Sequence, residues 1–178
     1  MLTVKSFNVY NVLTVNIGKR IVDWYLIFKV FHLSGIILFL GNIIISGWWK
    51  AMADRQGDPL VIAFAQHQVT LTDWVFTLGG VVLLIIGGQG MSNIASYDNV
   101  SWIFWGWVLF GASGVIWALI LIPLQFKLAK ITKEFQRGID IPEQYWRLSK
   151  QWYAWGVIAT VLPLINLYVM IFRFGGEV

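Results

Sequence analysis

The fold is decided by residues 22–49, which read VDWYLIFKVFHLSGIILFLGNIIISGWW. This stretch is longer than the roughly 20 residues that an α-helix needs to cross the hydrocarbon core of a bilayer. Its formal charges are Asp23 and Lys29, both near its beginning. Tryptophans lie close to both of its ends, where amphipathic rings suit the membrane–water interface. We therefore predict a first membrane-spanning helix here.

The composition of the whole chain agrees with this prediction. The chain has 178 residues, of which 58% are hydrophobic and 12% are charged. Soluble globular domains usually carry about 25% charged residues. A water-soluble fold of this length could not bury so much apolar surface, so the composition indicates an integral membrane protein.

Three further apolar runs follow the first. They cover residues 59–88, residues 102–122 with a more polar continuation to about 135, and residues 142–174. None shows the alternation of polar and apolar residues that is typical of membrane β-barrel strands. We predict an all-α, polytopic bundle of four transmembrane helices, with a single domain over residues 21–178 and an N-terminal tail over residues 1–20.

The distribution of basic residues predicts the orientation. The segments after the first and third runs lie on the same side of the membrane, and together they contain Lys50, Arg55, Lys127, Lys130, Lys133, Arg137, Arg147 and Lys150. The other side holds fewer basic residues. By the positive-inside rule the first side is cytoplasmic, so both termini are predicted to be extracytoplasmic.

Several function classes are disfavoured by what the sequence lacks. It contains no cysteine, which excludes disulfides, thiolate metal sites, iron–sulfur clusters and covalently attached c-type haem. No nucleophile motif or phosphate-binding loop is present, which argues against hydrolase and ATPase chemistry. No basic block carries the interleaved aromatic residues of a nucleic-acid surface.

The first helix carries a mixed stripe of polar, small and aromatic residues. At 100° per residue one face presents Phe28, His32, Gly35, Phe39, Asn42 and Ser46, with Lys29 at its edge. Small and polar residues can serve helix packing alone. Ionisable residues within a membrane helix also commonly face a cavity or a bundle interior. Both interpretations stay open for this face.

The second helix contributes His67 and Asp73. Counting residues from the shared cytoplasmic end of the two helices places Asp73 level with Gly35, within about one helical turn of His32. We therefore predict a hydrogen bond between His32 and Asp73, which would orient the imidazole. The predicted binding residues are His32, Lys29, Asp73 and Asn42. The alternative is a buried pair that only holds the two helices together.

A haem b could be bound through His32. His67 lies at a different depth, so it cannot supply the second axial ligand, and Met170 or Met91 are the alternatives in the same half of the membrane. A quinone-like molecule is the other ligand class that we consider. A zinc site is not expected, because two separated histidines and one deep carboxylate do not provide the three or four clustered ligands that zinc needs.

The sequence resembles a known family in four motifs. They are KVFHLSG (29–35), GWWK (47–50), TDWVFT (72–77) and IPEQYWRL (141–148). Together these look like the bacterial integral membrane family catalogued as domain of unknown function 2269, over about residues 24–174. The resemblance implies four helices and a bacterial cytoplasmic (inner) membrane location, and no activity. The extension at residues 1–20 departs from the family pattern.

A shorter similarity concerns Lys29 and His32. This Lys-x-x-His spacing in a first membrane helix is similar to that of the four-helix bacterial protoporphyrinogen oxidase family, whose members bind haem. The match covers about one helical turn, and the Arg-rich continuation of those oxidases is missing here. The resemblance implies contact between His32 and a tetrapyrrole.

Three functions remain open at this point. The first is a protein with an intramembrane polar pocket for haem or a quinone-like cofactor, in a respiratory or redox role. The second is a non-catalytic accessory or assembly subunit of a larger membrane complex. The third is a small proton-coupled carrier that uses Asp73 and His32. We also expect a homo-oligomer or a larger complex, with Gly114 and Ala118 as the contact face.

Overall fold

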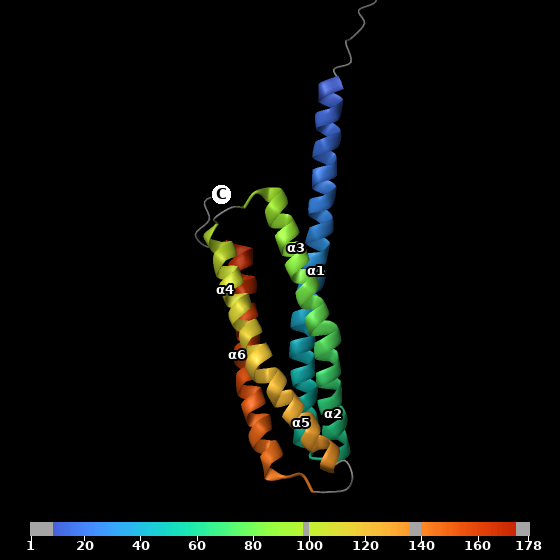
Figure 1. Ribbon diagram of the computed structural model, residues 1–178, viewed down its shortest axis with the longest axis vertical. Coiled ribbons are helices and arrows are strands. Elements are labelled where there is room, and N and C mark those ends of the chain that lie inside the picture. The colour runs from blue at the N-terminus through green and yellow to red at the C-terminus, as the bar shows by residue number, and fades with distance from the viewer. Residues whose placement is uncertain (1–8, 98–99, 136–139, 174–178) are drawn as a thin grey trace, which may run out of the picture.

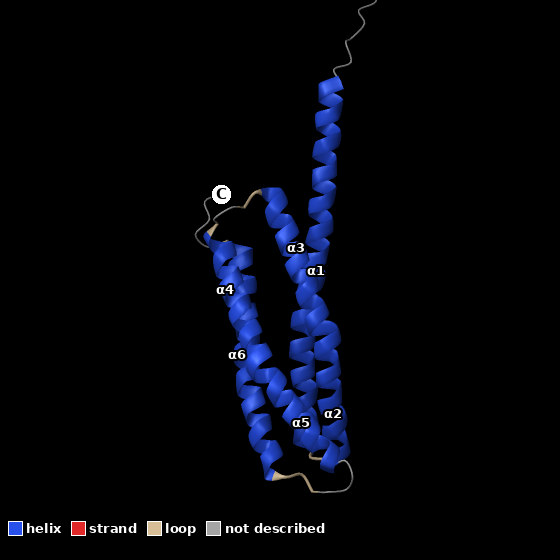
Figure 2. Cartoon of the chain, viewed as in Figure 1, coloured by secondary structure: helices blue, strands red, loops and turns tan. Residues whose placement is uncertain are grey.

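The computed structural model is made of long helices in its described parts, residues 9–97, 100–135 and 140–173, with side chains described from Arg20 onwards. Four spans follow one another (Figures 1 and 2). Span 1 is α1 (Val9–Gln56); span 2 joins α2 (Pro59–Thr72), the π-helix η1 (Asp73–Thr77) and α3 (Leu78–Ala95); span 3 joins α4 (Ser101–Ile116), the π-helix η2 (Trp117–Leu121) and α5 (Ile122–Phe135); span 4 is α6 (Glu143–Phe172).

Each of the four spans is long and apolar enough to cross a membrane. This confirms the predicted all-α fold with four transmembrane helices. We refer to the end of the bundle that holds Gln56, Pro59, Phe135 and Glu143 as the basic end, because Lys and Arg residues cluster near it in the sequence. The other end is called the opposite end.

Two predicted helix ends are wrong. Span 1 continues to Gln56 instead of ending at Trp49, and span 2 continues through the glycine-rich segment to Ala95 instead of ending near Gly88. The first helix stops where Gly57 takes a φ of 76°, a conformation that favours glycine. The second span then starts with Asp58 as its N-cap, which accepts backbone hydrogen bonds from Leu60 and Val61.

The predicted N-terminal tail is largely an extension of span 1. Residues 1–8 lie outside the described residues, whereas residues 9–20 belong to the same helix as the membrane segment. Figure 1 shows this part of α1 projecting beyond the other spans.

Spans 1 and 2 pack closely through glycines. A Cβ on Gly80 would lie 2.7 Å from the backbone nitrogen of Phe39, and a Cβ on Gly87 would lie 2.3 Å from that of His32. Gly35 is equally tight against Leu84. These distances leave no room for a side chain, so the two backbones touch along this seam. The packing role considered for Gly35 therefore holds in the structure.

Spans 3 and 4 form a second pair. The Ser113 hydroxyl donates to the backbone oxygen of Ala159 at 2.7 Å, and the Asn166 amide donates to that of Gly106 at 3.1 Å. The two pairs meet mainly near the basic end, where α2 packs on α5 and α1 on α6. The described backbone of α4 does not approach α1 or α3, and Figure 1 shows these helices apart at the opposite end.

Candidate functional site

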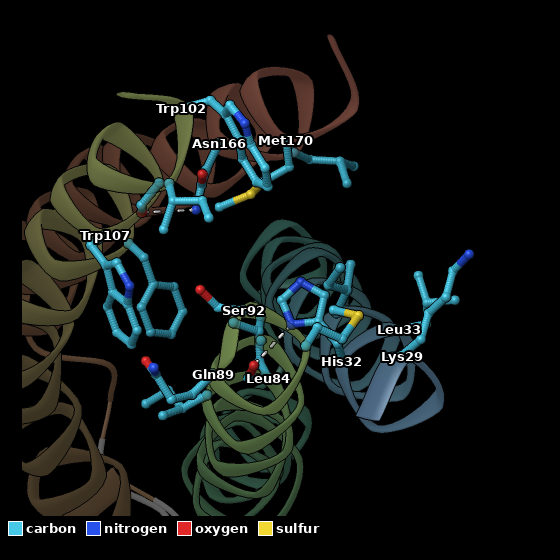
Figure 3. A pocket seen from close by; sticks show the side chains of 18 of the residues that line it. Lys29, His32, Leu33, Leu84, Gln89, Ser92, Trp102, Trp107, Asn166 and Met170 are labelled. Atoms are coloured by element: carbon cyan, nitrogen blue, oxygen red, sulfur yellow. Dashed lines mark hydrogen bonds between the residues drawn. The ribbon is translucent and has the colours of Figure 1, made fainter. Parts of the chain in front are cut away.

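A cavity of about 280 Å³ lies between the two helix pairs toward the opposite end. We call it the His32 pocket. Its lining is mainly apolar and aromatic, and all four spans contribute to it. The basic, aromatic, amide and thioether side chains of this lining include Lys29, His32, Met91, Trp102, Trp107, Phe110, Asn166, Met170 and Arg173. Figure 3 shows His32 on one side of this space, with Asn166 and Met170 on the other.

The imidazole of His32 has a fixed orientation. Its Nδ1 lies 2.9 Å from the backbone oxygen of Leu84. A carbonyl oxygen can only accept, so Nδ1 carries a proton, and in the neutral ring Nε2 then keeps its lone pair. Nε2 has no hydrogen-bond partner among the described residues, and Figure 3 shows it on the side of the ring turned toward Asn166 and Met170. A neutral imidazole held this way can accept a hydrogen bond or bind a metal.

Glycines of span 2 pack against the imidazole of His32 and its neighbours. A Cβ on Gly88 would lie 3.1 Å from Nδ1 of His32, and a Cβ on Gly90 would overlap the ring of Phe28. The sequence GGQG at residues 87–90, where the second apolar run was expected to end, is helix in the structure, and its Gly87 and Gly88 contact His32.

The charges at the pocket are basic. Lys29 and Arg173 belong to its lining, and the described lining includes no Asp or Glu. The guanidinium carbon of Arg173 lies 5.9 Å from the ring centre of Tyr97 and 5.7 Å from that of Trp102. Lys29 is exposed, and Figure 3 shows its ammonium directed away from His32. Lys29 therefore lies at the edge of the His32 pocket, with its charge outside the cavity.

The two methionines expected near His32 lie in the same pocket. Met91 and Met170 both line it, as the sequence analysis expected for the half of the membrane that holds His32. Met170 rests on span 3, because a Cβ on Gly106 would overlap its terminal methyl group.

The predicted hydrogen bond between His32 and Asp73 is wrong. Asp73 accepts hydrogen bonds from Asn42 at 3.0 Å, from Thr77 at 3.0 Å and from Gln125 at 2.5 Å. The error came from the end of span 1. Because that helix continues seven residues beyond Trp49, the depth count was displaced by about 10 Å at 1.5 Å per residue. Asp73 therefore lies level with Asn42.

The four predicted binding residues do not form one site. His32 and Lys29 line the His32 pocket, whereas Asn42 and Asp73 belong to a separate buried cluster with Thr77 and Gln125. This Asp73 cluster joins spans 1, 2 and 3. The second histidine, His67, is exposed and lines neither cavity.

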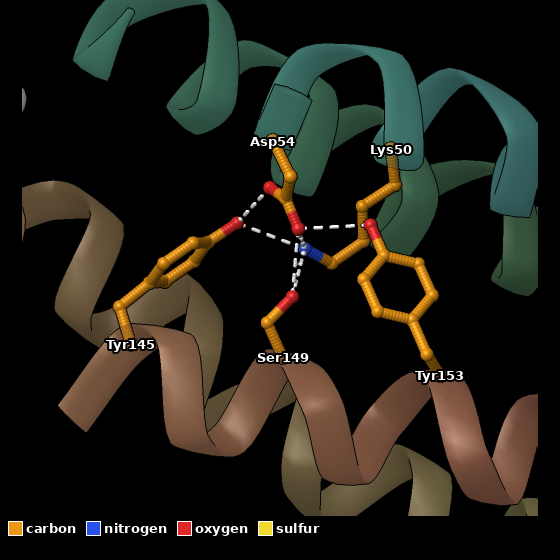
Figure 4. A network of polar contacts seen from close by, with 5 residues as sticks. All are labelled: Lys50, Asp54, Tyr145, Ser149 and Tyr153. Carbon is orange, nitrogen blue, oxygen red and sulfur yellow. Dashed lines mark hydrogen bonds and ion pairs between the residues drawn. The ribbon is translucent and has the colours of Figure 1, made fainter. Parts of the chain in front are cut away.

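The sequence analysis missed a polar network at the basic end. Lys50 is only 1% exposed, and its ammonium donates to Asp54 at 2.9 Å, to Tyr145 at 2.8 Å and to Ser149 at 3.0 Å. The hydroxyls of Tyr145, Ser149 and Tyr153 all donate to the carboxylate of Asp54. Figure 4 shows these five residues, which we call the Lys50 network, between spans 1 and 4.

Two sequence patterns could have identified the Lys50 network. Lys50 and Asp54 have the i, i+4 spacing of an ion pair within a helix, and Lys50 continues the buried stripe of Asn42 and Ser46. Tyr145, Ser149 and Tyr153 repeat every four residues on one face of span 4. The sequence analysis ends the first helix at Trp49 and places Lys50 in the segment after it, which hides the first pattern.

The arrangement limits the possible chemistry. The described residues contain no group of three or more His, Cys, Asp or Glu side chains that could hold a metal ion. An iron held in a macrocycle needs only one or two protein ligands, so His32 satisfies that requirement. The Lys50 network has its charges paired and hydrogen-bonded, which is what a buried ion pair needs to be stable.

Comparisons with known proteins bear on the family alone. No match is found among curated proteins or among solved structures, so the similarity to protoporphyrinogen oxidases gains no support. A family model described as "Predicted integral membrane protein (DUF2269)" matches residues 26–174. Since this match covers most of the sequence, the chain belongs to the DUF2269 family of integral membrane proteins.

Proposed function

We propose that this protein binds a flat, lipid-soluble redox cofactor of the quinol class in the His32 pocket, and that Nε2 of His32 is its polar contact. The observation that carries the proposal is the hydrogen bond from Nδ1 to the Leu84 carbonyl, which leaves Nε2 as an acceptor at the cavity. A quinol hydroxyl is a donor and pairs with such a nitrogen. Compounds of this class carry electrons, so the role we propose is a redox one.

The size and the walls of the pocket support a single aromatic ring. Its volume of about 280 Å³ is close to the lower end of ligand pockets, which start at roughly 300 Å³. Trp102, Trp107 and Phe110 offer ring faces and edges for stacking.

Haem b is the second candidate, and the presence of Met91 and Met170 in the same pocket favours it. A neutral histidine with its other nitrogen bonded to a carbonyl has the arrangement of a metal-ligating imidazole. A thioether could supply a second axial ligand. Arg173, in the lining of the pocket, could pair with the carboxylates of a tetrapyrrole.

The two histidines offer a matched experiment. Protein in lipid nanodiscs is titrated with a benzoquinol while tryptophan fluorescence is followed. We expect His32→Ala to weaken binding up to about tenfold, since a net hydrogen bond contributes about 0.5–1.5 kcal/mol. His67→Ala, at an exposed position, is the control and should change nothing. Equal affinities for wild type and His32→Ala would contradict the proposal.

The haem candidate is tested on the same variants. Purified protein is mixed with hemin and its absorption spectrum is recorded. A Soret band that is lost in His32→Ala and retained in His67→Ala, without quinol binding, would make haem the occupant. If neither compound binds to the wild type, the cofactor proposal fails and the accessory-subunit alternative takes its place.

Our proposal places the protein in the bacterial cytoplasmic membrane with both termini extracytoplasmic, on the basis of the Lys and Arg distribution. We also propose assembly into an oligomer or a larger complex. Many large apolar side chains of the four spans are exposed, and these faces meet either lipid or other membrane proteins.

A further inference from the structure

A second and larger cavity adjoins the His32 pocket. Its volume is about 810 Å³, and it lies between the two helix pairs on the side of the basic end. Phe39 and Phe110 belong to the lining of both cavities, and their ring centres are 5.9 Å apart. We call this cavity the apolar groove. These two rings are in edge-to-face contact and form a wall that the groove shares with the His32 pocket.

The walls of the apolar groove suit a hydrocarbon chain. Aliphatic and aromatic side chains from spans 1, 3 and 4 form most of them, with Ile44, Trp117 and Val157 as examples. Gly114 and Gly156 also line it, and a Cβ on either would meet no atom within 4 Å. These glycines therefore leave open space in the groove instead of permitting close helix contact.

The charged group at the groove is not an anchor for a lipid headgroup. Asp73 lines it, but this carboxylate is already hydrogen-bonded by Asn42, Thr77 and Gln125. The described lining contains no Lys or Arg that could bind a phosphate. The groove therefore offers contacts to an apolar chain whose polar end is held elsewhere.

We infer that the apolar groove holds the hydrocarbon tail of the compound whose ring lies at His32, so that the ligand class is a quinol with a polyprenyl tail. This inference rests on the function proposed above. The ring occupies the smaller pocket, the chain runs along the surface of the Phe39–Phe110 pair that both cavities share, and the tail lies in the larger groove. One molecule then fills both cavities.

Two quinols and two glycine variants test this inference. The probes are a dimethoxy-methyl-benzoquinol without a tail and the same ring with a decyl tail. Each is titrated into nanodiscs, and its affinity is expressed as the number of quinol molecules per lipid at half saturation. Gly156→Leu fills the groove without touching His32. Gly41→Leu is the control, because Gly41 is exposed, lines neither cavity and likewise has open space around its Cβ.

We expect the tail to strengthen binding to the wild type severalfold at equal amounts of quinol per lipid, because its methylene groups exchange mobile lipid neighbours for the packed walls of the groove. Gly156→Leu should remove most of this gain and leave the tailless quinol unchanged, and Gly41→Leu should change neither affinity. If Gly156→Leu weakens the binding of both quinols equally, or does not weaken the binding of the tailed quinol, the inference about the groove is overturned. The proposed ring site at His32 would still stand. If neither quinol binds to the wild type, both proposals fall.

Two other occupants would give different results. If Gly156→Leu changes the oligomer mass by native mass spectrometry and leaves tailed-quinol binding intact, the groove is a contact between helices of two copies, as first expected for Gly114 and Ala118. If the variant instead loses co-purified phospholipid and keeps its affinity for the tailed quinol, an acyl chain fills the groove. Either result would contradict the inference.

Discussion

The ammonium nitrogen of Lys50 lies 2.8 Å from the hydroxyl oxygen of Tyr145, 95 positions further along the chain. Both side chains are buried, and their contact connects span 1 to span 4 at the basic end. Burying a lysine in a membrane protein is costly unless its charge is paired. Asp54 supplies the opposite charge at 2.9 Å, so the whole network depends on the two charges being present together.

Removing the cation of this network should destabilise the fold. We expect Lys50→Met to cost about 3–5 kcal/mol, because it leaves the Asp54 carboxylate buried and unpaired. Thermal unfolding in detergent measures the loss, and Lys127→Met at an exposed position is the control. Replacing both charges, Lys50→Met with Asp54→Leu, should restore part of the stability. A double variant less stable than Lys50→Met would contradict this explanation.

The glycine seam between spans 1 and 2 should not tolerate even one methyl group. In Gly87→Ala the new Cβ would lie 2.3 Å from the backbone nitrogen of His32, so the spans must separate. Overpacking of this kind costs about 1–3 kcal/mol. Gly41→Ala has open space and a better helix former, so it should be neutral or stabilising. Equal unfolding temperatures for the two variants would show that the seam is looser than described.

The Asp73 cluster should contribute to stability and not to the ring site. Asp73→Asn loses one of its acceptor oxygens, so a buried partner such as Gln125 loses its hydrogen bond. We expect a cost of about 1–3 kcal/mol in unfolding free energy. Affinity for the tailless quinol, which binds at His32 alone, should be unchanged. A selective loss of affinity with normal stability would instead connect Asp73 to binding.

The orientation of the bundle can be tested with reporter fusions. The excess of Lys and Arg at the basic end predicts that this end is cytoplasmic. Alkaline phosphatase fused after Val178 should then be active, because it matures in an oxidising compartment. The same enzyme inserted between Arg137 and Pro142 should be inactive. The reverse pattern would invert the predicted topology.

The spans themselves could be predicted because their signal is spread over many residues. Length and hydropathy identify a membrane helix even when its ends are misplaced. The buried stripe of span 1 was also found, since Gly35, Phe39, Asn42 and Ser46 are all buried in the structure. These residues share a face by helical periodicity alone, without knowledge of their partners.

The partners could not be predicted, because they depend on how the helices align. Ending span 1 at Trp49 instead of Gln56 was enough to give Asp73 the wrong partner. The Leu84 carbonyl, which holds His32, is a backbone group that any residue carries, so sequence gave no reason to choose it. The π-helical segments at 73–77 and 117–121 likewise shift the later residues of spans 2 and 3 around the helix axis.

The apolar groove is bordered by exposed side chains such as Ile44, at 53%, and Val157, at 62%. A ligand that enters between them comes sideways from the surrounding lipid and never crosses the aqueous phase. Occupancy then follows the number of ligand molecules per lipid, not their amount per volume of buffer. Adding empty micelles or vesicles at constant total ligand should therefore release the ligand by dilution within the apolar phase.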